Sequence, residues 1–478
     1  MILSCVRECS PLVTQPRIAE LDYAADTSRR FRAFAHAPWC VLLDSGRPGS
    51  RQGRFDIFSA EPYATLTTRG EVTEITTRDR VELSYRQPLE LLKRQLGEPE
   101  PSVAGLPFAG GAIGYFGYDL GRRFERLPHL AQRDIDVPDM AIGLYDWAVI
   151  VDHLRKRAWL VGQGRDERTL DEWPELLEKV SGQPPSLAAQ PFEVLSPVTS
   201  NFDRDTYEQA FRRIQEHIRA GDCYQVNLTQ RFTARVQGDS WQAYERLREI
   251  NPAPFSAFLS TPSGDLLSSS PERFLSVRGS DVETKPIKGT RPRAALKQKD
   301  AELARELRAS VKDRAENVMI VDLLRNDLGK SCVPGSVVVD SLFEIESFAN
   351  VHHLVSTVRG RLTAGRHALD LLQGCFPGGS ITGAPKVRAM EIIESLEPHR
   401  RSVYCGSIGY IGFDGNMDCN IAIRTLLRQG EQIHAWAGGG IVADSEVEAE
   451  YRESLDKAAL LLELMTRGMP RAGAGGRR

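Results

Sequence analysis

The chain has 478 residues, about three times the length of a common domain, so one core of ordinary size cannot account for it. Hydrophobic residues make up 41%, charged residues 26% and aromatic residues 8%, a composition that excludes a disordered, collagen-like or disulfide-scaffold protein. The 61 basic and 64 acidic side chains nearly cancel to a net charge of −3, so nothing global attracts nucleic acid or an anionic membrane surface. A charged substrate must therefore be held by local sites.

The sequence favours a cytoplasmic protein that does not span a membrane. No apolar run approaches the roughly 18 residues of a spanning helix, and the first residues lack the basic and then apolar pattern of a signal peptide. The cysteines contain no Cys-x-x-Cys pair and are interpreted as reduced thiols that hold no zinc. They are Cys5, Cys9, Cys40, Cys223, Cys332, Cys375, Cys405 and Cys419.

Strand-like runs broken by turn residues dominate the N-terminal part, which we predict to span residues 18–165. The predicted strands are 40–44, 55–60, 63–68, 109–116 and 141–151. The segment 182–200 contains four prolines, which disfavour both helix and sheet pairing, and it is predicted to be a linker between two interlocked parts.

The second part, residues 201–467, begins with a predicted helix that runs from Asp203–Asp205 to Arg219 and ends at Gly221. Two β-meanders are predicted over 255–290 and 403–437, and long helices over 298–328 and 445–467. Residues 468–478 are predicted to be a disordered tail. Because the strands do not alternate regularly with helices, the pattern favours an α+β fold with large, mostly antiparallel sheets and flanking helices.

The glycine-rich segments of this sequence do not match the common nucleotide-binding motifs. Gly378 and Gly383 have the spacing of a phosphate loop, but Ala384-Pro385 stands where Lys-Ser or Lys-Thr is required. Gly111, Gly114 and Gly117 do not have the dinucleotide-binding spacing. The common nucleotide cofactors are therefore disfavoured.

Two pairs of acids, Asp313 with Glu316 and Glu450 with Glu453, are spaced by three residues on predicted helices. Each pair projects from one side of its helix, so two helices that meet could place four carboxylates around a hard divalent cation. The alternative is a solvated charged face, on which Glu453 pairs with Lys457.

Lys288 stands where a predicted strand meets a glycine turn, between stiffening prolines, and Glu272 lies at the start of a neighbouring strand. The two side chains could form an acid and nucleophile pair, or only a cross-strand ion pair. Taken alone, Lys288 fits an exposed turn lysine as well.

Three further clusters offer contacts for an anion. The backbone amides of Gly438, Gly439 and Gly440 carry no side chains that would block a ligand, and Thr382 adds a hydroxyl beside Lys386. Arg424 can grip a carboxylate through two hydrogen bonds. The pair His352-His353 can hydrogen-bond a substrate or serve the structure alone.

Together these segments resemble the chorismate-utilising enzymes over roughly residues 20–465. The blocks that carry the resemblance are Ser270–Phe274, Pro286–Thr290, Asp313–Asn317, Asp322–Asp327, His353–Ser356, Pro377–Lys386, Ile421–Thr425, Gly438–Asp444 and Glu450–Glu453. The resemblance implies large antiparallel sheets packed as a sandwich with outer helices.

The resemblance also implies roles for the clusters. Mg²⁺ held by Glu316 and Glu453, with Glu450 and Asp313 beside them or acting through water, would chelate the ring carboxylate of chorismate. The enolpyruvyl carboxylate would contact Arg424, Tyr404 and the amides of Gly438–Gly440. Lys288 would attack C2 while Glu272 protonates the departing C4 hydroxyl. Other positions expected to face the substrate are Thr290, His353, Thr382 and Lys457.

Lys288 also separates branches of the family, since anthranilate synthases typically carry alanine there. Its presence implies that ammonia enters at C4 and gives 4-amino-4-deoxychorismate, for para-aminobenzoate and folate biosynthesis. The alternatives are an anthranilate synthase large subunit and, more distantly, a non-catalytic chorismate-binding protein. For attack, the pKa of Lys288 must be lowered, and we expect Lys285, Arg291, the cation and desolvation to do this. Glu272 needs a raised pKa.

Two partners follow from the resemblance. None of the cysteines stands in a Gly-x-Cys-x-Gly elbow, so a separate glutamine amidotransferase subunit is expected to supply ammonia. Residues 42–46 and 251–256 resemble tryptophan-binding segments of the anthranilate branch. The candidate tryptophan contacts are Leu43, Ser45, Asn251, Pro252 and Phe255.

Overall fold

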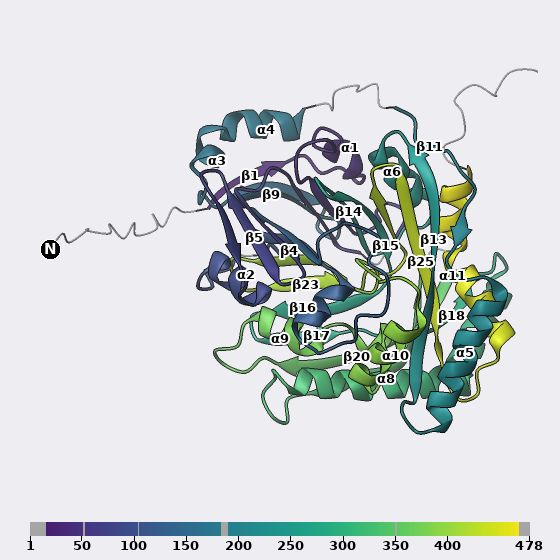
Figure 1. The fold of residues 1–478 in the computed structure, drawn as a ribbon. Coiled ribbons are helices and arrows are strands. Elements are labelled where there is room, and N and C mark those ends of the chain that lie inside the picture. The colour runs from purple at the N-terminus through teal and green to yellow at the C-terminus, as the bar shows by residue number, and fades with distance from the viewer. Residues whose placement is uncertain (1–15, 51–52, 104, 183–189, 349–350, 468–478) are drawn as a thin grey trace, which may run out of the picture.

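The computed structural model describes residues 16–50, 53–103, 105–182, 190–348 and 351–467. Its strands form two large sheets in which every paired neighbour is antiparallel, and helices cover their outer faces (Figure 1). The predicted fold class is therefore confirmed.

The first sheet contains thirteen strands within the described residues and has the order β1-β10-β9-β3-β2-β14-β15-β24-β25-β13-β11, with β12 and β21 also paired to β13. Its strands are β1 (Arg17–Leu21), β2 (Val41–Asp44), β3 (Phe55–Ser59), β9 (Trp147–Asp152), β10 (Arg157–Gly162), β11 (Glu193–Val194), β12 (Thr199–Ser200), β13 (Gln225–Gln237), β14 (Phe255–Thr261), β15 (Gly264–Ser270), β21 (Gly383–Ala384), β24 (Thr425–Gln429) and β25 (Gln432–Ile441).

The second sheet contains twelve strands in the same described ranges and has the order β18-β20-β17-β16-β23-β22-β7-β8-β4-β5-β6, with β19 paired to β20. Its strands are β4 (Ala64–Arg69), β5 (Val72–Thr77), β6 (Val81–Ser84), β7 (Gly111–Phe116), β8 (Met140–Tyr145), β16 (Arg273–Arg278), β17 (Asp281–Thr284), β18 (Ile287–Pro292), β19 (Val338–Ser347), β20 (Val351–Arg361), β22 (Ser407–Gly412) and β23 (Met417–Asn420).

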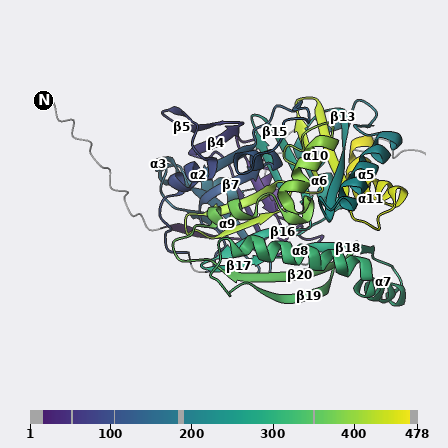
Figure 2. The same ribbon diagram turned by 60° about the horizontal axis from the view of Figure 1, so that its bottom comes forward.

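The helices lie at the ends and outer faces of these sheets. They are α1 (Ser28–Phe31), α2 (Pro88–Leu96), α3 (Glu167–Asp171), α4 (Trp173–Ser181), α5 (Arg204–Arg219), α6 (Ser240–Ile250), α7 (Lys297–Ala309), α8 (Val311–Gly329), α9 (Ala368–Cys375), α10 (Lys386–Leu396) and α11 (Val447–Arg467), with 3-10 turns at Tyr118–Arg123 and Gly379–Ile381. Helices α5 and α11 pack beside β13 and β25 (Figure 1), whereas α7 and α8 lie against β18 and β20 (Figure 2).

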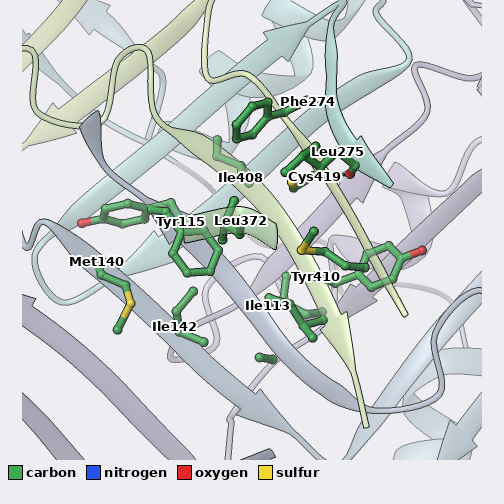
Figure 3. Packing of buried hydrophobic residues seen from close by; sticks show 14 of the residues in the cluster. Ile113, Tyr115, Met140, Ile142, Phe274, Leu275, Leu372, Ile408, Tyr410 and Cys419 are labelled. Carbon is green, nitrogen blue, oxygen red and sulfur yellow. Dashed lines mark hydrogen bonds between the residues drawn. The ribbon is translucent and has the colours of Figure 1, made fainter. Parts of the chain in front are cut away.

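The sheets pack face to face over one continuous apolar core. Val41 and Ile57 of the first sheet belong to the same apolar cluster as the second-sheet residues in Figure 3, where Ile113 of β7 and Ile408 of β22 lie on neighbouring strands. Each part contributes one block of strands to each sheet, and the blocks join where β2 pairs with β14 and where β7 pairs with β22. A second apolar cluster lies between the first sheet and its outer helices.

Several predicted elements need correction. The single strand predicted over 141–151 is two strands, β8 and β9, that belong to different sheets. The helix predicted over 298–328 is broken at Ser310, whose extended backbone ends α7 and whose hydroxyl accepts the Asp313 amide to cap α8. In the segment 182–200, β11 and β12 pair with β13 despite the nearby prolines. Residues 183–189 and the predicted tail 468–478 lie outside the described residues.

Candidate active site

Both predicted meanders are wrong in the same way, and this difference builds the site. The chain leaves the first sheet after β15 and enters the second at β16, and it makes the reverse passage between β23 and β24. The two crossings are hydrogen-bonded together: the Ser270 hydroxyl donates to Ile421 O at 2.6 Å, and the Ile421 amide donates to Glu272 O at 3.0 Å. Glu272 and Arg424 therefore both lie at the junction between the sheets.

Lys288 lies in β18, where the register to β20 shifts between Ile287 and Thr290. Gly289 follows with φ +81°, and a Cβ there would lie 2.8 Å from the Asp313 carboxyl carbon, so glycine is required. This irregular backbone allows the partly buried Lys288 side chain to reach Ser380, whose carbonyl oxygen accepts a hydrogen bond from Nζ at 3.0 Å.

Glu272 also contacts Ser380, through a hydrogen bond with the Ser380 side chain, and only 5% of the Glu272 surface is exposed. Burial raises the pKa of Glu272, although Lys288 and a hydrogen bond from the Ser380 side chain oppose the shift. Burial lowers the pKa of Lys288, although Glu316 and Glu272 oppose it. Desolvation therefore moves the acid towards its protonated form and the amine towards its neutral form.

The neighbours that were expected to lower the pKa of Lys288 are engaged elsewhere. Arg291 pairs with Glu306 and with Asp313 at 3.3 Å, and Lys285 pairs with Glu346. Lys457 is the main cationic neighbour that adds to the lowering. The prediction for Lys285 and Arg291 is therefore wrong, because opposite charges hold both side chains.

The candidate metal ligands come from α8 and α11. Glu450 is 2% exposed and accepts a hydrogen bond from the Ser445 hydroxyl at 2.7 Å, so it does not lie on a solvated face. The Glu453 side chain is 46% exposed and pairs with Lys457 at 2.6 Å, as the alternative interpretation of a charged face expects. A Cβ at Gly439 would lie 3.1 Å from Glu450 Oε2 and 3.5 Å from Glu453 Oε1. Both carboxylates therefore surround this glycine.

Glu316 faces the same region from α8. Burial raises its pKa, Lys288 and Lys312 oppose the shift, and Glu453 adds to it. The pKa of Glu453 is lowered, because Lys457 outweighs the opposing effect of burial. Lys312 bridges the two helices, with its Nζ 3.6 Å from Glu450 Oε1.

The donor set suits a hard cation in type, because carboxylate oxygens are the ligands that Mg²⁺ prefers. Within the part of the chain that the structure describes, however, no three His, Cys, Asp or Glu side chains converge as a ready-made metal-binding group. Glu450 and Glu453 are each neutralised by a lysine, and the Asp313 carboxylate is turned to Arg291.

Arg424 is the candidate carboxylate ligand on the opposite side. Its backbone has φ +49°, and burial alone lowers the pKa of its guanidinium. Among the described residues, no carboxylate lies within ion-pair distance of it. A buried guanidinium without a counter-ion favours an anionic ligand.

His353 lies near Arg424 and is 2% exposed. Burial, with Arg424 adding to it, lowers the pKa of His353 to about 3, so the ring is neutral in ordinary buffers. Its Nδ1 lies 2.9 Å from the Thr290 hydroxyl, and its buried Nε2 has no hydrogen-bond partner in the described ranges. Such an atom is available to a substrate.

The remaining residues that were predicted to contact the substrate differ in the partners that they already have within the protein. Gly438, Gly439 and Gly440 form a strand and not a turn: they pair with β13, while β24 stops pairing with β25 at Ala435 and leaves the other edge open. Tyr404 is buried and stacks on Trp436. The Thr382 hydroxyl donates to Gly378 O within its own turn. Lys386 is held by Asp327 and Cys375 O, so it is not an anion contact.

Three participants were missed by sequence reasoning. Ser380 contacts both Lys288 and Glu272, and Lys312 faces Glu450. Asn317 is fully buried, accepts a hydrogen bond from the Ser356 hydroxyl at 2.5 Å, and has an unpartnered Nδ2. Ser380 and Asn317 stand inside blocks that had been singled out. Only the contacts across distant segments distinguish them.

A cavity of about 330 Å³ is lined by residues from both sheets. Leu43 and Phe255, two of the predicted tryptophan contacts, line it together with Asp44, Arg273 and Tyr410. The other three do not line it directly: Ser45 is bonded to Asp56, the Asn251 side-chain amide donates to Ser269, and Pro252 packs against Gly49.

Comparison with known proteins supports one family. A family described as chorismate binding enzyme matches residues 40–463. Aminodeoxychorismate synthase component 1 of Klebsiella aerogenes is 50% identical over 452 residues, which cover 94% of this chain and 98% of that protein. The protein of the same name from Escherichia coli is 50% identical over 436 residues, covering 91% and 94%. The crystal structure of anthranilate synthase component I from Streptococcus pneumoniae superposes with a TM-score of 0.78 at 32% identity, covering 86% and 93%.

Proposed function

The chain belongs to the chorismate-binding enzyme family, and we propose that it is a transferase with the activity of aminodeoxychorismate synthase component 1. It converts chorismate and ammonia to 4-amino-4-deoxychorismate and water, a step towards para-aminobenzoate and folate. The observation that carries the proposal is the placement of Lys288 and Glu272 about Ser380. Burial shifts the pKa of each in the direction that this chemistry needs.

In the proposed reaction, the neutral Lys288 amine forms a bond to C2 of chorismate while both conjugated ring double bonds shift, from C1=C2 and C5=C6 to C1=C6 and C4=C5, and the C4–O bond breaks. Glu272 gives its proton to the departing hydroxyl, which leaves as water. Ammonia then bonds to C4, both double bonds shift back, and the C2–N bond to Lys288 breaks. The proton lost by the incoming ammonium returns to Glu272, so the enzyme regains its starting state.

The substrate carboxylates are assigned to opposite sides of the site. Arg424 binds the enolpyruvyl carboxylate, because its buried guanidinium has no counter-ion in the described residues. We assign Tyr404 and the edge of β25 at Gly438–Gly440 to the same carboxylate, with Gly439 also adjoining Glu450 and Glu453. The neutral His353 offers Nε2 to a polar group of the substrate, and Thr290 fixes the ring through Nδ1.

We assign Glu316, Glu450 and Glu453 as residues that hold Mg²⁺, with Asp313 contributing from further out. When bound, Mg²⁺ would supply positive charge for the ring carboxylate and so help to fix the substrate. The carboxylate oxygens and the approach of Glu450 and Glu453 to the same glycine, Gly439, support this assignment. Lys457, which bonds to Glu453 and to Gly438 O at 3.1 Å, borders the same side of the site.

Two partners belong to the proposal. The name component 1 implies a second component, and we propose a glutamine amidotransferase that releases ammonia from glutamine. We also propose that tryptophan occupies the cavity at Leu43 and Phe255, which offers apolar surface beside the ion-paired side chains of Asp44 and Arg273. Among the described helices, none has the length and apolar character needed to cross a bilayer. A cytoplasmic location remains part of the proposal, on the basis of the thiol pattern.

The nearest alternative is the anthranilate synthase reaction, which gives an aromatic amine and pyruvate from the same substrate. An assay of the purified chain with chorismate, MgCl₂ and ammonium chloride distinguishes the two reactions by their products. The proposal predicts a product that becomes para-aminobenzoate only after a lyase is added, whereas anthranilate fluorescence without added enzymes would overturn it. Tight chorismate binding without turnover would instead support a non-catalytic binding protein.

A further inference from the structure

Lys312 has no role in the proposed reaction, yet it occupies a central position. It lies in the first turn of α8, and its Nζ is 3.6 Å from Glu450 Oε1 on α11. The Lys312 side chain is 54% exposed, whereas the Glu450 side chain is 3% exposed. A carboxylate so deeply buried requires a positive partner, and in this structure Lys312 supplies it.

Lys312 also interacts with the other candidate ligands. Glu450, Glu316 and Glu453 all act electrostatically on its ammonium group. Lys457 neutralises Glu453 independently, at 2.6 Å. The anionic side of the site is therefore balanced by two lysines before any ligand is bound.

The two lysines differ in how firmly they are held. Lys457 bonds to Glu453 and also donates to Gly438 O in the sheet. Lys312 contacts Glu450 at the outer limit of an ion pair, and more than half of its side chain faces solvent. A lysine with a flexible stem at a solvent boundary can swing out without breaking the backbone structure.

We propose that Lys312 is the resident counter-ion of Glu450 and that a divalent cation must displace it, so that Lys312 sets the affinity of the site for the cation. The inference rests on the proposed assignment of Glu316, Glu450 and Glu453 to the metal. An ammonium and a dication repel each other, so a cation that binds at Glu450 weakens the hold of this carboxylate on Lys312.

The test measures cation binding without substrate. Full-length, metal-free protein is titrated with Mn²⁺, and free Mn²⁺ is followed by electron paramagnetic resonance. Lys312→Met is expected to lower the Kd for Mn²⁺ by about tenfold, because one competing positive charge is gone. Lys299→Met is the matched control, since Lys299 is 58% exposed and lies 3.6 Å from Glu302 on the neighbouring helix. It should bind Mn²⁺ like the wild type.

A second readout follows the displaced amine in the wild-type chain. Acetylation by a limiting reagent, measured by peptide mass spectrometry, should be faster at Lys312 when MgCl₂ is present and unchanged at Lys299. An unchanged Kd in Lys312→Met, or an acetylation rate that ignores MgCl₂, overturns the inference. Failure of the wild type to bind Mn²⁺ also overturns it. The product assay is run separately. It decides whether the proposed conversion of chorismate holds even when the inference about Lys312 fails.

Discussion

Lys288 of β18 and Glu272, which lies in the passage from β15 to β16, meet at a common neighbour, Ser380: its carbonyl oxygen accepts a hydrogen bond from the Lys288 amine at 3.0 Å, and its side chain hydrogen-bonds to the Glu272 carboxylate. Neither residue is near the other in sequence, and burial shifts the two pKa values in opposite directions. This relationship gives the first two predictions.

Lys288→Ala should lower the rate of 4-amino-4-deoxychorismate formation by about 10³-fold, the order found when a covalent nucleophile is removed. The space left near C2 should admit ammonia and move the residual product towards anthranilate, which chromatography with fluorescence detection measures. Lys285→Ala is the control, because Lys285 is paired with Glu346 outside the reaction. Incubation with chorismate but no ammonia should also trap an adduct on Lys288 in the wild type. Failure to find it by intact-mass spectrometry counts against covalent catalysis.

Glu272→Gln should lower kcat by about 10²-fold or more, since proton donation to the leaving hydroxyl is lost. In the wild type, activity should rise with pH as Lys288 loses its proton and fall as Glu272 loses its own. The lowered pKa of Lys288 extends the first limb to lower pH, and the raised pKa of Glu272 extends the second to higher pH. The Gln variant should keep the rising limb and lack the falling one. If the pH–activity profile of Glu272→Gln keeps its falling limb, that limb belongs to the titration of another group.

Arg424→Met should raise the KM for chorismate by about 10- to 100-fold, because a charge-assisted contact to a carboxylate is removed. Its melting temperature should not fall, since the substitution removes a buried charge that has no counter-ion in the described residues. Arg428→Met, in the strand β24 that follows Arg424, serves as the control: Arg428 donates hydrogen bonds to Gly238 O and the Ser240 hydroxyl, away from the site. An unaltered KM in Arg424→Met would remove Arg424 from substrate binding.

His353 should make the protein sensitive to acid. Its pKa is about 3 in the folded chain and about 6.5 when unfolded, so between these values only the unfolded state takes up the proton. The free energy of unfolding should therefore fall as the pH drops below 6.5, by about 2 kcal/mol at pH 5 from this group. Urea unfolding of wild type and His353→Asn across this range measures the difference. If the free energy of unfolding changes equally with pH in both proteins, His353 is not the group responsible.

Gly439→Ala should raise the Mg²⁺ concentration required for half-maximal activity. Its methyl group would lie 3.1 Å from Glu450 Oε2 and 3.5 Å from Glu453 Oε1, and it would push the carboxylates apart. The backbone of Gly439 is in β25, a conformation that alanine adopts readily, so folding should be preserved. Circular dichroism checks the fold and an activity titration checks the metal. A Mg²⁺ titration identical to that of the wild type would place the cation elsewhere.

Local patterns in the sequence predicted the elements well where neighbouring residues decide the structure. The helix that begins after Asp203 is present because Asp203 accepts the Thr206 amide and caps it. Strand alternation also located β2, β3, β4 and β7 within a residue or two of their ends.

The sequence could not predict which sheet receives each strand. The run 255–290 has the pattern of a continuous meander, yet it changes sheets at Ser270–Arg273 because its partner β23 lies about 145 residues away in sequence and across the core. The same limit applied to the site. Lys288 and Glu272 could be singled out from local features, but Ser380 and Lys312 act only through contacts with distant segments.

The joining of the two parts inside each sheet has a consequence for any attempt to divide the enzyme. Because β2 borders β14 and β7 borders β22, a chain severed within 182–200 would give two fragments whose sheet edges are unpaired and hydrophobic. Each edge fits only the other fragment, so the halves should aggregate alone and regain activity on co-folding. A fluorescent reporter fused to each half would then show in the cell whether the two fragments have folded together.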